Sequence, residues 1–265
     1  MLAEEHNVIV AVHSYKGGTG KTLLSANLAT TFAAKGKKTC LLDMDFRAPS
    51  LYSLFKMKEP EYWLNDYLSG GCCAKDLLQK CDSDKLGTGN LFVGFANPSI
   101  EAFREIASKD KWWEMEALTR LFSFRDSLFD ELEFEYLFLD TSPGLQYSSA
   151  NAVVVADVAL VVTTLDESDV QGTRLMLQGL YEHFEKKTLI VMNKIPDVLK
   201  RSQRVKDFQG VLGGFQVVFG ECVGCSCDLP LSEDPCFFAG HRPGHPFSRT
   251  LEKIASEIVA CARKT

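Results

Sequence analysis

The feature of this chain that most constrains its fold is a glycine-rich loop that follows an apolar run near the start of the sequence. Residues 8–12 read Val-Ile-Val-Ala-Val, which has the length and composition of a buried strand. The loop itself, residues 16–22, reads Lys-Gly-Gly-Thr-Gly-Lys-Thr, and helix-forming residues 23–34 follow it. The sequence therefore predicts a strand, a glycine loop and a helix in succession.

The glycine loop has the chemistry of a phosphate-binding site. Its three glycines let the backbone curl so that N–H groups point inward at an anion, and the dipole of the following helix acts at the same place. Lys21 is placed to reach the β and γ phosphates of a nucleotide, and the Thr22 hydroxyl is placed to bind magnesium. The residues expected to contact the phosphates are Gly17, Gly18, Thr19, Gly20, Lys21 and Thr22.

Two residues of the loop depart from the general phosphate-loop pattern Gly-x-x-x-x-Gly-Lys-Ser/Thr. Tyr15 stands in place of the first glycine, and a second lysine, Lys16, lies just inside the loop. The run Lys-Gly-Gly-x-Gly-Lys-Thr resembles the deviant phosphate loop of the MinD/ParA superfamily of ATPases. The resemblance implies bound ATP and Mg²⁺, and a homodimer formed on ATP binding, in which Lys16 reaches the phosphates held by the partner subunit.

A second apolar run, residues 39–42, ends in the acidic pair Asp43-Met44-Asp45. Alternation puts Asp43 and Asp45 on the same side of a strand, at its carboxyl end, where open α/β sheets place their chemistry. The resemblance implies that Asp45 orients the water that attacks the γ-phosphate. Two acids that cap a following turn are the alternative.

A third apolar run leads into Asp140-Thr141-Ser142-Pro143-Gly144. An acid at the end of a strand beside a phosphate loop can hold magnesium through its water shell, and Asp140 is that acid. The segment resembles the second switch of the same superfamily, Asp-Thr-x-Pro-Gly, which implies that the Gly144 N–H senses the γ-phosphate.

The remainder of the chain alternates helix and strand patterns, with helices at 148–155 and 169–184 and strands at 158–164 and 189–192. We therefore predict an α/β fold with a doubly wound, mostly parallel sheet and helices on both faces, as in P-loop NTPases of the SIMIBI-like type. The last of these strands ends in Asn193-Lys194. The resemblance implies that the Asn193 amide bonds the adenine edge, although Asn-Lys is also a good turn.

Residues 51–133 have a less regular pattern, with a short strand expected at 91–95 and one or two helices within 100–132. Apolar side chains recur there at helical spacing, which favours core packing over the alternative of a partner-binding surface. These side chains are Phe103, Ile106, Trp112, Trp113, Met115, Leu118, Leu121 and Phe122.

A cysteine-bearing segment, residues 222–236, contains Cys222 and Cys225 in a Cys-x-x-Cys arrangement. This spacing is used by zinc and iron–sulfur sites, which need four ligands. A metal site, a redox pair and inert thiols all remain open. A metal could also be shared by two subunits, as some members of the superfamily do. The other residues near enough to complete a set are Cys227, Cys236, His241 and His245.

Length, charge and hydropathy limit the classes of protein to which the chain can belong. A length of 265 residues fits a single α/β domain over residues 1–265. The net charge of −6 argues against general nucleic-acid binding, although four basic residues within 200–206 could contact phosphates or form a solvated helix face. No apolar run approaches the ~20 residues of a membrane span, and no signal sequence is seen. We expect a cytoplasmic protein, with an amphipathic helix at 247–263 that packs on the sheet and binds no membrane.

The resemblance implies an ATPase that acts as a molecular switch, dimerises on ATP, and positions, recruits or delivers a partner protein. Its hydrolysis should be slow, because a carboxylate with the reference pKa of Asp45 is a poor base and positions water instead. One alternative is an ATP-gated carrier or insertion factor for a metal or iron–sulfur cluster, with Cys222 and Cys225 as its working site. Another is a DNA-associating partitioning ATPase.

Overall fold

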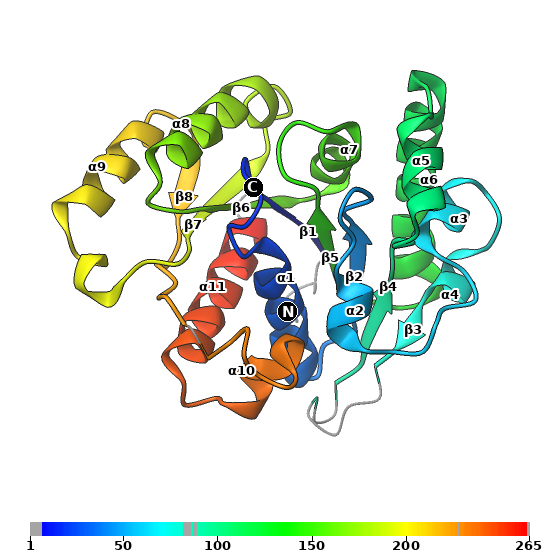
Figure 1. Cartoon of the computed structure of the whole chain (residues 1–265), viewed down its shortest axis with the longest axis horizontal. Coiled ribbons are helices and arrows are strands. Elements are labelled where there is room, and N and C mark those ends of the chain that lie inside the picture. The colour runs from blue at the N-terminus through cyan, green and yellow to red at the C-terminus, as the bar shows by residue number, and fades with distance from the viewer. Residues whose placement is uncertain (1–6, 82–85, 87–88, 227, 264–265) are drawn as a thin grey trace, which may run out of the picture.

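A computed structural model describes residues 7–81, 86, 89–226 and 228–263. These residues form an eight-stranded sheet in the order β3-β4-β2-β5-β1-β6-β7-β8 (Figure 1). All neighbouring strands are parallel except β3 and β4, which pair antiparallel at one edge. The strands are β1 Val8–His13, β2 Thr39–Met44, β3 Gln79–Lys80, β4 Leu91–Gly94, β5 Tyr136–Thr141, β6 Val158–Thr163, β7 Lys187–Met192 and β8 Val217–Phe219.

Helices cover both faces of the sheet, so the predicted fold class is confirmed. The helices α1, α2, α10 and α11 pack on one face, and α3, α4, α6, α7, α8 and α9 pack on the other. Two helices continue into a π-helical turn, α6 into η2 (Ser127–Glu131) and α8 into η3 (Leu177–Tyr181). The α-helices are α1 Lys21–Ala34, α2 Leu51–Phe55, α3 Leu64–Leu68, α4 Ala74–Leu77, α5 Ile100–Ala107, α6 Lys111–Asp126, α7 Tyr147–Val155, α8 Glu167–Met176, α9 Gln203–Leu212, α10 Phe238–His241 and α11 Pro246–Arg263.

The central strands are buried along their whole length because both faces of the sheet are covered. Every residue of β1, β2, β5 and β6 is buried, as expected for parallel strands between two helical layers. Alternate side chains of β1 enter opposite cores, with Val10 on the α1 side and Ile9 on the α6 side. Because β1, β2, β5, β6 and β7 pair in parallel, their carboxyl ends lie at the same edge of the sheet. The glycine loop, Asp45, the segment that ends at Gly144, and Asn193 follow these strand ends.

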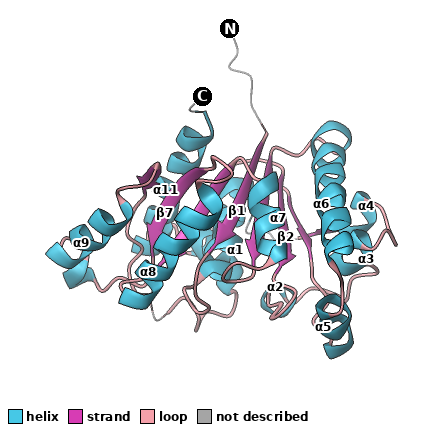
Figure 2. Cartoon of the chain, turned by 90° about the horizontal axis from the view of Figure 1, so that it is seen from above, coloured by secondary structure: helices cyan, strands magenta, loops and turns pink. Residues whose placement is uncertain are grey.

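The helices α3, α4, α5 and α6 gather beside the β3–β4 end of the sheet, opposite the end that carries α9 (Figures 1 and 2). Leu121 of α6 is buried, as predicted, but Trp112 and Met115 are 77% and 62% exposed and Phe103 is also exposed. The prediction of core packing is wrong for these three side chains. The face of α6 that meets the core carries Leu121 and Phe124, whereas Trp112 and Met115 lie on another face of the helix.

The C-terminal region is attached to α1 by buried hydrogen bonds. The Asn27 side chain donates to the Pro235 carbonyl at 2.7 Å and accepts from the Ala239 N–H at 3.0 Å. The predicted amphipathic helix is α11, which packs Leu251 and Ile254 into the core beside α1. Within the described ranges, no helix combines the length and the apolar composition that crossing a membrane requires.

Candidate functional site

Residues 14–20, which include most of the glycine loop, join the carboxyl end of β1 to α1. Gly18 has φ 77° and Gly20 has φ 89°, values in the left-handed region that glycine adopts without strain. A Cβ at Gly20 would also overlap the side-chain amide of Asn193, which closes the loop from outside. Both glycines are therefore needed for the loop to turn into the helix.

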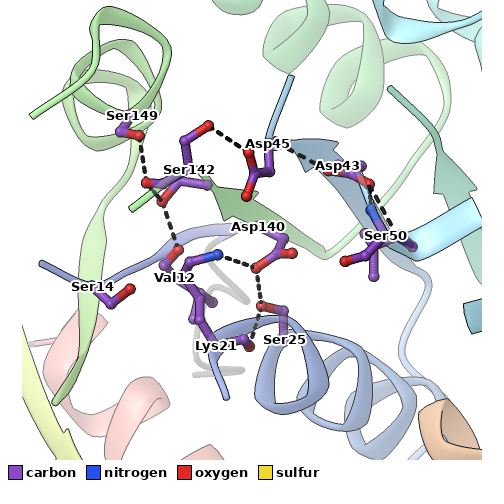
Figure 3. Close-up of polar contacts among 12 residues, drawn as sticks. Val12, Ser14, Lys21, Ser25, Asp43, Asp45, Ser50, Asp140, Ser142 and Ser149 are labelled. Atoms are coloured by element: carbon purple, nitrogen blue, oxygen red, sulfur yellow. Dashed lines mark hydrogen bonds and ion pairs between the residues drawn. The ribbon is translucent and has the colours of Figure 1, made fainter. Parts of the chain in front are cut away.

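Lys21, the first residue of α1, forms a buried ion pair with Asp140 of β5 (Figure 3). Lys21 Nζ lies 3.3 Å from Asp140 Oδ1, and the two side chains are 7% and 1% exposed. Ser25 Oγ donates to the same Oδ1 at 2.8 Å. In the part of the chain that the structure describes, Asp140 Oδ2 and Thr19 Oγ1 are buried and have no hydrogen-bond partner.

These unpartnered oxygens fit the predicted nucleotide and magnesium ion. A buried oxygen without a partner is costly, so a site that keeps one is organised for a group that it binds. Thr22 lies at the start of α1, partly exposed, next to Lys21. Its hydroxyl and the Asp140 carboxylate are oxygen ligands of the kind that Mg²⁺ prefers.

Asp43 lies on β2 directly beside Asp140 in the parallel register. Its carboxylate accepts hydrogen bonds from the N–H groups of Asp45, Ser50 and Leu51, at 3.0 to 3.2 Å. Burial, together with the nearby Asp140 charge, raises the pKa of Asp43 to about 8. Asp43 therefore holds the backbone that follows β2 and supports the turn in which Asp45 lies.

Asp45 connects the turn after β2 to the segment after β5. Its Oδ1 accepts from the N–H groups of Arg47 and Ala48, at 3.2 and 3.1 Å, and from Ser142 Oγ at 2.9 Å (Figure 3). Asp45 thus caps its turn, as the alternative interpretation held. The Ser142 contact also ties Asp45 to the loop that contains Gly144. The turn after β2 and the segment after β5 are therefore linked directly.

Gly144 is held against the glycine loop through both of its backbone polar groups. Its N–H donates to the Ser14 carbonyl at 2.9 Å, and its carbonyl accepts from His13 Nε2 at 2.8 Å. Its φ of 76° again requires glycine. The N–H that is expected to sense the γ-phosphate therefore bonds the Ser14 carbonyl in this conformation.

His13, the last residue of β1, is a buried residue of the site that the sequence patterns did not single out. Its Nδ1 lies 2.6 Å from the hydroxyl of Tyr181 in η3. Burial, with a smaller effect of the Lys21 charge, lowers the pKa of His13 to about 4. The ring is therefore neutral at pH 7. No local pattern marks this residue, because its partner is 168 positions away.

The depressed pKa of His13 predicts a loss of stability in acid. Because the folded pKa of His13 lies below the ordinary 6.5, the neutral ring stabilises the folded protein. This contribution to the free energy of unfolding is complete above pH 6.5 and is lost as the pH falls toward 4. Between pH 7 and pH 5 we expect the free energy of unfolding to fall by about 2 kcal/mol more in the wild type than in His13→Gln, whose amide can make both hydrogen bonds without titrating. Urea unfolding at the two pH values measures this difference.

The comparison with the variant is needed because Asp43 acts in the opposite direction. Protonated Asp43 stabilises the folded protein. This contribution is complete below the ordinary pKa of an aspartate, and it is lost as the pH rises through the folded pKa of about 8. Asp43 is present in both proteins, so it cancels in the difference. Equal pH dependence in the wild type and in His13→Gln would contradict a neutral, buried His13.

The Lys16 side chain contacts residues at the start of α8 in the same chain, and it does not lie over the phosphate site of that chain. Its Nζ is 2.8 Å from Asp166 Oδ1 and also contacts Ser168 Oγ. Asp166 caps the N-terminus of α8 by accepting from the Asp169 N–H at 3.0 Å. The hydrogen bond to Asp166 raises the pKa of Lys16, and the Lys16 ammonium lowers the pKa of Asp166.

Asn193 and Lys194 follow β7 and hold the glycine loop from outside. The Asn193 side chain donates to the Thr19 carbonyl, and Lys194 Nζ donates to the Gly18 carbonyl, both at 2.7 Å. The Asn193 amide that is expected to meet adenine therefore bonds the loop in this conformation. Lys194 stood beside it in the predicted turn, but its contact with Gly18, 176 positions away, had no signal in the sequence.

Comparison with known proteins agrees with this geometry. A family model described as an AAA domain matches residues 7–192. The septum site-determining protein MinD of Synechocystis is 30% identical over 202 residues, which are 75% of this chain and 69% of that protein. The chain belongs to the MinD/ParA family of P-loop ATPases.

Two further similar proteins are an uncharacterized protein and a solved structure. An uncharacterized ATP-binding protein of Methanocaldococcus jannaschii is 31% identical over 163 residues, and the match covers 62% of this chain and 55% of that protein. The solved structure of MinD from Pyrococcus horikoshii, complexed with Mg-ADP, has a TM-score of 0.73 at 20% identity. That match covers 97% of this chain and 99% of the other, and it shows the same fold.

The described residues of the cysteine segment in this MinD/ParA chain do not favour the metal site that the Cys-x-x-Cys spacing left open. Cys222 is half-buried against the small cluster of Met192, Ile195 and Val205, and burial raises its pKa. Cys225 is exposed, and its N–H donates to the Ile195 carbonyl at 3.0 Å, which continues the edge of the sheet. The described residues bring no three of His, Cys, Asp and Glu together as metal ligands, and Cys227 lies outside them. Zinc and an iron–sulfur cluster are therefore not supported.

Two of the four basic residues within 200–206 make contacts within the chain. Lys200 pairs with Asp197 at 2.8 Å. Arg204 donates to the Leu165 carbonyl and lies over the Phe208 ring. At least two of the four basic side chains therefore already have partners within the chain, and nothing in their arrangement favours the DNA-associating alternative.

Proposed function

We propose that this chain is an ATP-binding, slowly hydrolysing ATPase that dimerises when ATP is bound and uses the dimer to position, recruit or deliver a partner protein. The observation that carries the proposal is the position of Lys16. Its side chain is 41% exposed beside the phosphate loop, and a solvent-exposed ion pair to Asp166 retains it. Solvent screens such an exposed pair and leaves it weak, so a partner's phosphates can compete for this lysine.

The nucleotide in this proposal is held by the loop and by α1. The loop N–H groups and Lys21 bind the phosphates, while Thr22 and Asp140 hold magnesium, which neutralises phosphate charge when bound. The Lys21–Asp140 contact orients both side chains before a nucleotide arrives. The Mg-ADP present in the Pyrococcus horikoshii relative supports this assignment of ligand and metal.

Asp45 is proposed to orient the attacking water. Its Oδ1 is already fixed by three donors, so the carboxylate has one orientation, and Oδ2 is left to accept a hydrogen bond from the water. The Ser142 contact makes that orientation depend on the segment that ends at Gly144. A water positioned by a carboxylate of this kind suits slow turnover, as a switch requires.

A second copy of the chain is proposed to cover the surface formed by the residues that follow Gly144. Leu145 and Tyr147, which follow Gly144 directly, are both exposed. A second subunit that covered these two side chains would remove their apolar surface from water. With a dimer, Lys16 of each subunit would contribute to the phosphate site of the other.

The test of this proposal pairs two variants that act in opposite directions on Lys16. Lys16→Ala removes the charge that the partner site needs, so ATP turnover should fall at least about tenfold while ATP still binds the monomer. Asp166→Asn keeps an N-cap for α8 but weakens the retaining ion pair, so dimerisation should need less ATP. Light scattering with ATP and magnesium measures the dimer, and phosphate release measures turnover.

The two variants also separate the proposed role of Lys16 from a structural role. A lysine that only stabilises α8 through its ion pair would give Lys16→Ala and Asp166→Asn the same effect. Opposite shifts in the ATP concentration needed for dimerisation support the proposal. A wild-type protein that stays monomeric at saturating ATP would refute it.

A further inference from the structure

The helix α8 and its π-helical extension η3 contact the beginning of the phosphate loop at three places. Asp166, at the start of α8, holds Lys16. In the middle of the helix, a side chain at Gly172 would overlap the Tyr15 ring, so the helix backbone lies against Tyr15. At the end of η3, the Tyr181 hydroxyl meets His13. One continuous helical segment thus touches positions 13, 15 and 16.

The contact at the η3 end is a hydrogen-bonded chain with a defined direction. The Gly144 carbonyl can only accept, so His13 Nε2 carries the proton and donates to it at 2.8 Å. Because the ring is neutral, Nδ1 accepts, and the Tyr181 hydroxyl donates to it at 2.6 Å. We call the chain Tyr181–His13–Gly144 the histidine bridge. All of its side-chain polar atoms are buried and paired, so the arrangement is unique.

The histidine bridge ends at the residue whose N–H is proposed to meet the γ-phosphate. In this conformation that N–H donates to the Ser14 carbonyl, and His13 holds the carbonyl of the same glycine. A Gly144 that turns toward a phosphate must give up the Ser14 contact. The strength of the His13 contact then sets how readily the loop leaves its present position.

We propose that His13 and Tyr181 are positioning residues, which hold Gly144 in the position where its N–H bonds the Ser14 carbonyl and make its release depend on the position of α8. The proposal rests on the proposed function, and deepens it by naming how the contact of Lys16 with α8 is connected to Gly144. When Lys16 leaves Asp166 for a partner's phosphate, the N-terminal end of α8 loses its contact with the phosphate loop. At the other end of the same helical segment, Tyr181 contacts His13, which holds the Gly144 carbonyl.

The test is a pair of Tyr→Phe variants that each remove one buried hydroxyl. Tyr181→Phe keeps the ring but leaves His13 Nδ1 without a donor, so the hold on Gly144 weakens. Half-maximal dimerisation with a non-hydrolysable ATP analogue should then occur at about a three- to tenfold lower analogue concentration, the value of one hydrogen bond. Tyr67→Phe is the matched control, because its hydroxyl donates to the Arg120 carbonyl at 3.0 Å on α6. It should leave the midpoint unchanged.

A second measurement uses the wild type alone and does not depend on any variant folding. In protein labelled with ¹⁵N-histidine, His13 should show the Nε2–H tautomer without nucleotide, and its ring signals should shift when the analogue is added. An unchanged midpoint in Tyr181→Phe, or a His13 ring that does not respond to the analogue, overturns the histidine bridge while leaving the proposed function intact. A wild type that binds the analogue and stays monomeric overturns both.

Discussion

A Lys21→Ala variant is expected to lose at least about 100-fold in ATP affinity, and all measurable turnover with it, because the charge-assisted hydrogen bonds to the β and γ phosphates are removed. The structure adds a second effect. Lys21 is the buried cation next to Asp140, which also accepts a hydrogen bond from Ser25. Removing one partner of a buried ion pair costs about 3 kcal/mol, so the variant should also be less stable without nucleotide.

Equilibrium binding of a fluorescent ATP analogue, phosphate release and urea unfolding measure these effects separately. Lys58→Ala, at an exposed lysine between α2 and α3, is the control and should match the wild type in all three. Circular dichroism establishes that Lys21→Ala is folded before its binding is interpreted. Turnover that persists at the wild-type rate in a folded Lys21→Ala protein would remove this loop from the proposed reaction.

An Asp45→Asn variant is expected to bind ATP normally and to hydrolyse it at least about 100-fold more slowly, because the amide group that replaces Oδ2 no longer accepts the hydrogen bond that orients the attacking water. The amide oxygen can still accept from Arg47, Ala48 and Ser142, so the turn and its link to the Gly144 loop remain. The dimer should therefore accumulate. Light scattering should give twice the monomer mass with ATP and magnesium, and the monomer mass when a chelator removes the magnesium.

Asp110→Asn is a suitable control for the loss of a carboxylate. Asp110 caps α6 by accepting from the Trp113 N–H at 2.9 Å, and asparagine performs the same capping. This control should hydrolyse ATP and cycle between monomer and dimer as the wild type does. If Asp45→Asn turns over at the wild-type rate, another group orients the water and the assignment of Asp45 fails.

The fold could be predicted because its signals are local. Continuous apolar runs such as residues 8–12 and 136–139 mark strands that are buried on both faces, and the glycine loop marks the turn between β1 and α1. The polar motifs at the carboxyl ends of three strands then had to meet, because parallel strands end at one edge of the sheet. The neighbouring positions of Asp43 and Asp140 follow from this rule.

The rest could not be predicted because it depends on contacts between distant segments. Nothing near His13 indicates Tyr181, and nothing near Lys16 indicates Asp166, which is 150 positions away. Helical spacing identified the apolar residues of α6, but Trp112 and Trp113 are both apolar, and only the packed structure shows that Trp112 faces solvent. The roles of Asp45, Gly144 and Asn193 remain predictions that the variants above can test.

Tyr15 and Gly172 together show how a departure from the general phosphate-loop motif is tolerated. The motif has glycine where this chain has a large aromatic side chain, and the helix beside it has no side chain where the ring lies. The Tyr15 ring occupies the space that a side chain at position 172 would need. In an alignment of homologues they should therefore vary together, with a bulky residue at one position only where the other is small. Exchange of phosphate loops between members would accordingly have to transfer both positions.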